Sequence, residues 1–266
     1  MPTPTLLPLP VPIPVADTPE LWQIPGVPGP GDAVRDLVVA TPPGYDDALD
    51  RRYPVVYLQD GQNLFDPATS FVGHWGLLET LADQGVTHPA IVVGIPNLGQ
   101  GRLKEYSPFD DAVRGVGEGV GYLKWLTGTV KPLIDATFRT LPEREHTAVG
   151  GSSMGGLFSL YAILGAAATF GSAWVMSPAL WYADGAVFRW LRRQPAPTGR
   201  IWLDVGVGEG EDELFDVRRM RDLLISRGWK LGSTLRYLED PRGDHDEASW
   251  GRQVHAHWAT LMGMIE

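Results

Sequence analysis

The sequence predicts an α/β fold whose mostly parallel central sheet is covered by helices on both faces. Two observations support it: short, almost continuously apolar runs, and longer segments of helical spacing that alternate with them. Continuous apolar runs are typical of strands buried on both faces, and their alternation with helices is typical of parallel sheets. The 266 residues are 44% apolar and contain no evident repeat, so we expect one large domain over residues 31–266.

The strand candidates are rich in β-branched and aromatic residues and end at glycine, proline or polar turns. They span residues 34–40, 53–58, 91–95, 147–149, 173–176, 201–205 and 234–238. Helical spacing of apolar residues predicts helices over 75–84, 120–138, 157–164, 186–193, 214–227 and 247–264. Pro132 lies inside the second of these helices and is expected to kink or divide it.

Residues 1–30 are crowded with prolines and are expected to form an extended, polyproline-like arm outside the domain. The apolar stretch 6–15 superficially resembles the core of a signal peptide. Its alternate prolines prevent a helix, however, and no basic residue precedes it. We therefore expect a cytoplasmic protein, with secretion as the weaker alternative. No apolar segment is long enough to span a bilayer.

Charge and cysteine content exclude several classes of function. The formal net charge is −10, from 32 acidic and 22 basic residues, which disfavours a polyanionic partner such as nucleic acid. Cysteine is absent, so disulfides, thiolate nucleophiles and cysteine-based zinc sites are excluded. A small molecule is the expected ligand, without nucleic acid or membrane as a partner, and the sequence leaves the oligomeric state open.

The most informative motif is Gly-Gly-Ser-Ser-Met-Gly-Gly at residues 150–156, which follows an apolar run and precedes a helical segment. A serine framed by glycines between a strand and a helix is typical of a nucleophile elbow. Gly151 and Gly155 bracket Ser153 in the Gly-x-Ser-x-Gly pattern, whereas the same frame around Ser152 ends on Met154 and fails. Ser153 is therefore the candidate nucleophile. The alternative is a glycine-rich turn with an idle serine.

A serine nucleophile needs an imidazole base, and that base needs a carboxylate to orient it. His245 lies in the polar turn before the last helix, where the hydrolase order of serine, acid and histidine places the base. The other histidines fall inside that helix or precede Ser153 in the chain: His255, His257, His74, His88 and His146.

Glu209 is the first carboxylate after the predicted strand 201–205, and glycines flank it. It is the preferred acid, with Asp212 and Glu211 as alternatives. The competing interpretation is that the acidic run 211–213 only complements the positive end of the helix that follows.

An oxyanion hole requires two backbone N–H groups. Met154, directly after the nucleophile, supplies one candidate, and Gln62 supplies the other, because Gly61 lets the loop after strand 53–58 approach closely. Asp60, Gln62 and Asp66 have a calcium-like spacing, but the glycine at loop position six and the final glutamate are missing. No metal is expected.

Five ordered segments, 53–66, 102–108, 150–157, 177–181 and 245–250, resemble the putative esterase family of α/β-hydrolases. That family includes enterochelin-esterase-like and esterase-D-like enzymes. The resemblance implies an α/β-hydrolase fold, hydrolysis of carboxylic esters and no cofactor. It places the nucleophile at Ser153, the histidine at His245 and the second oxyanion donor at Gln62. Family members differ in the acid, and some use only a serine-histidine dyad.

The substrate is less defined than the chemistry. Trp75, Tyr106 and Trp181 are candidates for an aromatic wall, with packing in the core or a lid as the alternative. Arg102 is a candidate for binding a substrate anion, with a surface ion pair to Glu105 as the alternative. We expect a serine esterase for short-chain or aryl esters. The alternatives are a siderophore or carbohydrate (feruloyl or acetyl) esterase and, from another class, a non-catalytic binding protein on a hydrolase fold.

Overall fold

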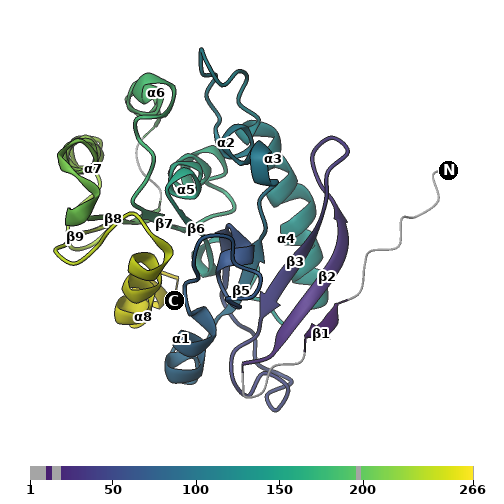
Figure 1. Ribbon diagram of the computed structural model, residues 1–266. Helices are drawn as coiled ribbons and strands as arrows, with labels where there is room; N and C mark the ends of the chain where they lie inside the picture. Colours follow the sequence, from purple (N-terminus) through teal and green to yellow (C-terminus); the bar gives the residue numbers. More distant parts are fainter. Residues whose placement is uncertain (1–9, 14–18, 196–198, 266) are drawn as a thin grey trace.

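The computed structural model describes residues 10–13, 19–195 and 199–265. Within these residues, nine strands form one sheet in the order β1-β2-β3-β5-β4-β6-β7-β8-β9 (Figure 1). The strands from β5 to β9 in this order run parallel, and β1, β2 and β3 pair antiparallel at one edge. The predicted mostly parallel sheet is confirmed.

The strands are β1 (Val11–Ile13), β2 (Leu21–Pro28), β3 (Val34–Ala40), β4 (Val55–Gln59), β5 (Ile91–Ile95), β6 (Thr147–Ser152), β7 (Ser172–Met176), β8 (Arg200–Gly206) and β9 (Leu235–Asp240). The helices are α1 (Leu77–Gln84), α2 (Arg102–Tyr106), α3 (Gly119–Trp125), α4 (Lys131–Thr137), α5 (Met154–Gly165), α6 (Tyr182–Leu191), α7 (Glu211–Ser226) and α8 (Glu247–Met262). Every predicted strand and helix therefore has a counterpart. The short helix α2 and the strands β1 and β2 were not predicted.

Helices cover both faces of the sheet, as predicted. Successive side chains of a strand point to opposite faces. In β4, Val55 and Tyr57 join the core under α2 to α7, whereas Val56 and Leu58 join the core under α1 and α8 (Figure 1). The strand is buried on both sides, which explains why its sequence is apolar throughout rather than alternating.

The predicted helix 120–138 is divided near Pro132, as expected. A single π-helical turn (Leu126–Val130) joins α3 to α4, and Pro132 occupies the second position of α4. Proline lacks the N–H that an α-helix needs in its interior, and the first turn of a helix is where this loss is tolerated.

The predicted boundary between arm and domain at residue 30 is wrong for the part of the arm that the structure describes. Strand β2 pairs antiparallel with β3 along its length, and Leu21, Ile24 and Val27 are buried in the core. The prolines are accommodated because Pro25 falls at a register irregularity between Ile24 and Val27, and Pro28 ends the strand. Residues 1–9 and 14–18 of the predicted arm lie outside the described residues.

Aromatic side chains pack tightly around α5, so removing one of them should destabilise the fold strongly. Phe158 of α5 is fully buried, with its ring centroid 4.8 Å from that of Tyr122. Phe158→Ala should lower the free energy of unfolding by about 3–5 kcal/mol, because the deleted ring leaves a cavity. The matched control is Phe215→Ala in α7, whose side chain is exposed and whose loss should cost less than about 0.5 kcal/mol. Urea unfolding measures both, and equal losses would contradict this packing.

Candidate active site

The turn between β6 and α5 has the geometry of a nucleophile elbow. Ser153 stands between the strand and the helix with φ 55° and ψ −117°, a conformation that non-glycine residues seldom adopt. Its N–H donates to the carbonyl of Met176 at 3.0 Å, and its own carbonyl accepts from Ala179 at 3.0 Å. These bonds tie the strained turn to the end of β7.

The glycines of the motif are required by close packing. A Cβ on Gly155 would lie 3.0 Å from the Cβ of Gln59, and one on Gly156 would lie 2.7 Å from the carbonyl oxygen of Met176. Side chains at these positions would push the elbow away from β4 and β7, so the glycines allow Ser153 to sit at the carboxyl edge of the sheet.

His245 contacts both predicted partners. It lies in the turn between β9 and α8, with Nε2 3.0 Å from Ser153 Oγ and Nδ1 2.6 Å from Glu209 Oε2. Asp246, the next residue, caps α8 by accepting the Ser249 N–H at 2.7 Å, which fixes the turn that carries the histidine. The indole of Trp250 packs edge-on against the imidazole, with centroids 5.0 Å apart.

Glu209 lies in a short 3-10 turn (Val207–Glu209) directly after β8. Its side chain is only 1% exposed, and Oε1 accepts hydrogen bonds from the Gly206 N–H at 2.7 Å and the Ser177 hydroxyl at 2.5 Å. Oε2 therefore faces His245. The alternatives Glu211 and Asp212 belong to the first turn of α7, where carboxylates complement the helix dipole.

The two predicted oxyanion donors are backbone groups at helix starts. Met154 is the first residue of α5, and Gln62 is the second residue of the 3-10 turn Gly61–Asn63 that follows β4. The first N–H groups of a helix have no carbonyl partner within it, so both can donate to a ligand. A Cβ on Gly61 would collide with the backbone of Gly94 and Ile95, which explains the glycine at this close approach.

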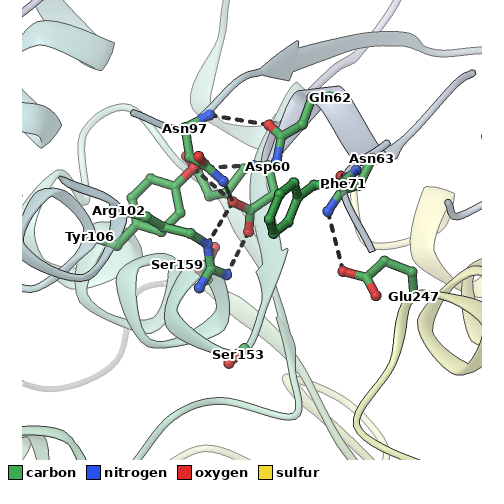
Figure 2. Close-up of polar contacts among 12 residues, drawn as sticks. Asp60, Gln62, Asn63, Phe71, Asn97, Arg102, Tyr106, Ser153, Ser159 and Glu247 are labelled. Carbon is green, nitrogen blue, oxygen red and sulfur yellow. Dashed lines mark hydrogen bonds and ion pairs between the residues drawn. The ribbon is translucent and has the colours of Figure 1, made fainter. Parts of the chain in front are cut away.

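Asp60 organises the loop that carries Gln62 (Figure 2). Arg102 binds its carboxylate with two hydrogen bonds of 2.7 Å, and Asn97 donates to Oδ1 at 2.6 Å. Tyr106 accepts the Asp60 N–H at 3.1 Å. Asn97 also donates its own N–H to the Gln62 side chain at 3.2 Å. Asp60 thereby connects the loops after β4 and β5.

The alternative offered for Arg102, a surface ion pair with Glu105, is wrong. Arg102 pairs with Asp60, 42 residues away, and Glu105 is buried against Arg35 at 2.5 Å. Burial raises the pKa of Glu105, and the Arg35 guanidinium opposes that shift. Arg102 does border the cavity described below.

A cavity of about 1090 Å³ opens beside Ser153 and His245. Its apolar lining comes from Phe71, Val72, Pro96 and Trp250. Phe71 is 87% exposed, and its N–H donates to the Asn63 side chain at 3.2 Å, which holds this loop beside the site. Asn63 also donates to Glu247 at 3.2 Å, as Figure 2 shows.

The predicted aromatic wall of Trp75, Tyr106 and Trp181 does not line this cavity. Trp75 is buried against Trp250, Tyr106 is buried under Asp60, and Trp181 is 46% exposed outside the cavity. Sequence pattern places a residue on a loop but does not fix the direction of its side chain. The lining residues Phe71 and Val72 carried one available signal, an apolar pair between Ser70 and Gly73 in an otherwise largely polar loop.

Within the described residues, no group of three or more histidine, aspartate and glutamate side chains is arranged to hold a metal ion. In the same part of the chain, no helix is both long and apolar enough to cross a membrane.

Comparison with known proteins places this chain in a family. Residues 33–261 match the family model described as "Putative esterase". The uncharacterized protein YbbA of Bacillus subtilis (strain 168) is 29% identical over 192 residues, which cover 70% of this chain and 73% of YbbA.

Two solved structures share the fold. The BES protein from Bacillus cereus aligns with a TM-score of 0.70 at 17% identity, over 96% of this chain and 98% of that one. The siderophore hydrolase EstA from Aspergillus nidulans aligns with a TM-score of 0.69 at 23% identity, over 92% and 94%. The fold is thus the predicted α/β-hydrolase fold. Since the family match covers most of the chain, this protein belongs to the putative esterase family.

Proposed function

We propose that this protein is a serine esterase in which Ser153 is the nucleophile, His245 the general base and Glu209 the acid that orients it. The observation that carries this proposal is the unbroken hydrogen-bond chain from Glu209 Oε2 through both nitrogens of His245 to Ser153 Oγ, with steps of 2.6 and 3.0 Å. The three side chains come from the segments that follow β6, β8 and β9. Membership of an esterase family supports ester hydrolysis as the reaction.

The geometry supports one assignment of the protons. Glu209 accepts a hydrogen bond, so Nδ1 of His245 carries the ring proton and Nε2 is free to accept the Ser153 proton. As Oγ attacks the ester carbonyl, that proton moves to Nε2 and the carbonyl oxygen becomes negative. The N–H groups of Met154 and Gln62 would stabilise that oxyanion, each contributing about 3 kcal/mol.

Collapse of the tetrahedral intermediate returns the proton from Nε2 to the leaving alcohol and leaves an acyl group on Ser153. Water then attacks the acyl-enzyme while His245 accepts its proton, and the second collapse releases the carboxylic acid and restores the serine hydroxyl. Glu209 stabilises the imidazolium that forms in both halves.

The cavity favours neutral ester substrates of short-chain or aryl type. Its charged lining consists of Asp60, Arg102, Asp246 and Glu247. Arg102 and Asp60 neutralise each other, so two carboxylates remain near Ser153. Burial raises the pKa of Glu247, and the neighbouring Asp60 carboxylate raises it further. A strongly anionic substrate would face repulsion here, whereas Phe71, Val72 and Trp250 offer contacts to an acyl or aryl group.

Replacing the nucleophile tests the proposal against a non-catalytic binding protein on the same fold. Ser153→Ala should lower kcat/KM for p-nitrophenyl butyrate by at least about 10³-fold, because the proposed acyl-enzyme forms on the Ser153 hydroxyl. Ser152→Ala, one residue earlier on β6, is the matched control and should retain most activity. Full activity in Ser153→Ala would contradict the assignment of Ser153 as the nucleophile.

The acid is tested by a pair of charge-removing substitutions. Glu209→Gln should lower kcat by up to about 10⁴-fold, because the amide stabilises neither the required tautomer nor the imidazolium. Asp212→Asn removes a carboxylate of α7 that is exposed and makes no contact with His245, so it should stay within about twofold of wild type. Near-normal turnover in Glu209→Gln would show that catalysis uses only Ser153 and His245, without Glu209.

Substrate charge gives a third test. Wild type should hydrolyse a neutral aryl ester faster than the same ester carrying a distal carboxylate, and added salt should narrow the difference. Glu247→Gln should raise kcat/KM for the anionic ester by about three- to tenfold relative to the neutral one. A wild-type preference for the anionic ester would contradict this substrate class.

A further inference from the structure

Three neighbouring strands end in non-glycine residues with positive φ. Asp60 follows β4 (φ 56°), Ser153 follows β6 (φ 55°), and Ser177 follows β7 (φ 39°). Such conformations cost free energy, and they persist where the surrounding structure holds the residue for a purpose. Asp60 organises the oxyanion loop and Ser153 is the proposed nucleophile. Ser177 has no role in the reaction described so far.

The hydrogen bonds of Ser177 fix the direction of its hydroxyl proton. Trp250 Nε1 donates to Ser177 Oγ at 2.9 Å, and an indole N–H can only donate. Ser177 must therefore accept from Trp250, which leaves its single proton for Glu209 Oε1 at 2.5 Å. The Ser177 N–H donates to the Asp204 carboxyl and carbonyl, each at 3.1 Å, so the backbone is held as firmly as the side chain.

The carboxyl of Asp204 is mostly protonated and uncharged below neutral pH, so it adds little negative charge beside Glu209. The carboxyl is fully buried at the end of β8, and this burial raises the pKa of Asp204 to about 7. Its oxygens accept from Ser177 and from the Trp202 indole at 2.7 Å. The group serves as an acceptor that anchors the Ser177 backbone.

Glu209 depends on this arrangement because its carboxylate can rotate about the last side-chain bond. The donors from Ser177 and Gly206 both act on Oε1, and together they turn Oε2 toward His245. Gly206, the last residue of β8 and three residues before Glu209, supplies only a main-chain N–H. Ser177 is the only side chain that donates to Glu209 besides His245 within the described residues.

We propose that Ser177 is a positioning residue for catalysis: its hydroxyl holds Glu209 in the rotamer that orients His245. The inference rests on the proposed serine-esterase function. Ser177 does not border the cavity that contains Ser153, so it acts through Glu209 rather than on the substrate.

The first test separates kcat from KM. Ser177→Ala should lower kcat for p-nitrophenyl butyrate by about ten- to a hundredfold, as expected for one charge-assisted hydrogen bond, while KM stays within about twofold. Ser172→Ala is the matched control, because Ser172 is a buried serine at the other end of β7 whose hydroxyl has no hydrogen-bond partner. It should retain wild-type kcat. Unchanged kcat in Ser177→Ala would overturn the inference.

A second variant distinguishes the loss of the hydroxyl from a loss of folding. Ser177→Gly removes the same hydroxyl but relaxes the positive φ, so it should fold at least as well as Ser177→Ala and show the same loss of kcat. Full kcat in the glycine variant would show that backbone conformation matters rather than the hydroxyl, and would overturn the inference.

A double-mutant cycle shows whether the effect passes through Glu209. In a Glu209→Ala background there is no carboxylate to position, so adding Ser177→Ala should change kcat by less than about twofold. An additive loss would contradict the inference. The cycle is measured beside Ser153→Ala: if that variant stays active, the serine-esterase proposal fails, whereas its inactivity together with normal kcat in Ser177→Ala defeats only the role of Ser177.

Discussion

The site depends on one backbone constraint, the strained turn at Ser153. The chain can reverse from β6 into α5 within a single residue only because glycines allow it to pack against Gln59 and the end of β7. The hydrogen bonds to Met176 and Ala179 offset the cost of the positive φ. This turn sets the height of the Ser153 hydroxyl above the sheet, and the proposed base, acid and oxyanion donors can act only if they are placed correctly relative to it.

Around that turn, parallel strands supply one element each. The loop after β4 carries Gln62, the turn after β8 carries Glu209, and the turn after β9 carries His245. Parallel strands end at a common edge, so groups up to about 180 residues apart in the chain meet there. Asp60, through Arg102 and Asn97, fixes the first of these loops, and Asp246 fixes the last by capping α8. Side chains outside the proposed triad thus account for much of the order of the site.

Sequence reasoning found the parts of the site that follow from chain order and spacing. Glycine spacing selected Ser153, the hydrolase order selected His245, and position after a strand selected Glu209, and the structure brings these three side chains together. Strand positions were predictable because both faces of the sheet are buried and the runs are continuously apolar. The resemblance to the esterase family rested on five motifs that occur in order along the chain.

The wrong predictions for individual residues have a common physical cause. Contacts between distant segments depend on the direction in which each side chain points and on which partner it finds. Tyr106 belongs to a segment near the site, yet its ring packs inward on Phe158 and Tyr122. Arg102 prefers a carboxylate 42 residues away to one three residues away. The proline-rich start was expected to lie outside the domain, but buried residues at every third position draw β2 into the sheet edge. Spacing along the chain encodes none of these three-dimensional choices.

If Ser153 is the nucleophile, an acyl-enzyme forms on its hydroxyl, and this intermediate can be trapped. Wild-type protein is mixed with p-nitrophenyl acetate, quenched in acid within the burst phase, digested and mapped by mass spectrometry. We predict one acetyl group on Ser153 and none on Ser152. An acetyl group on another residue, or turnover without any adduct, would contradict it.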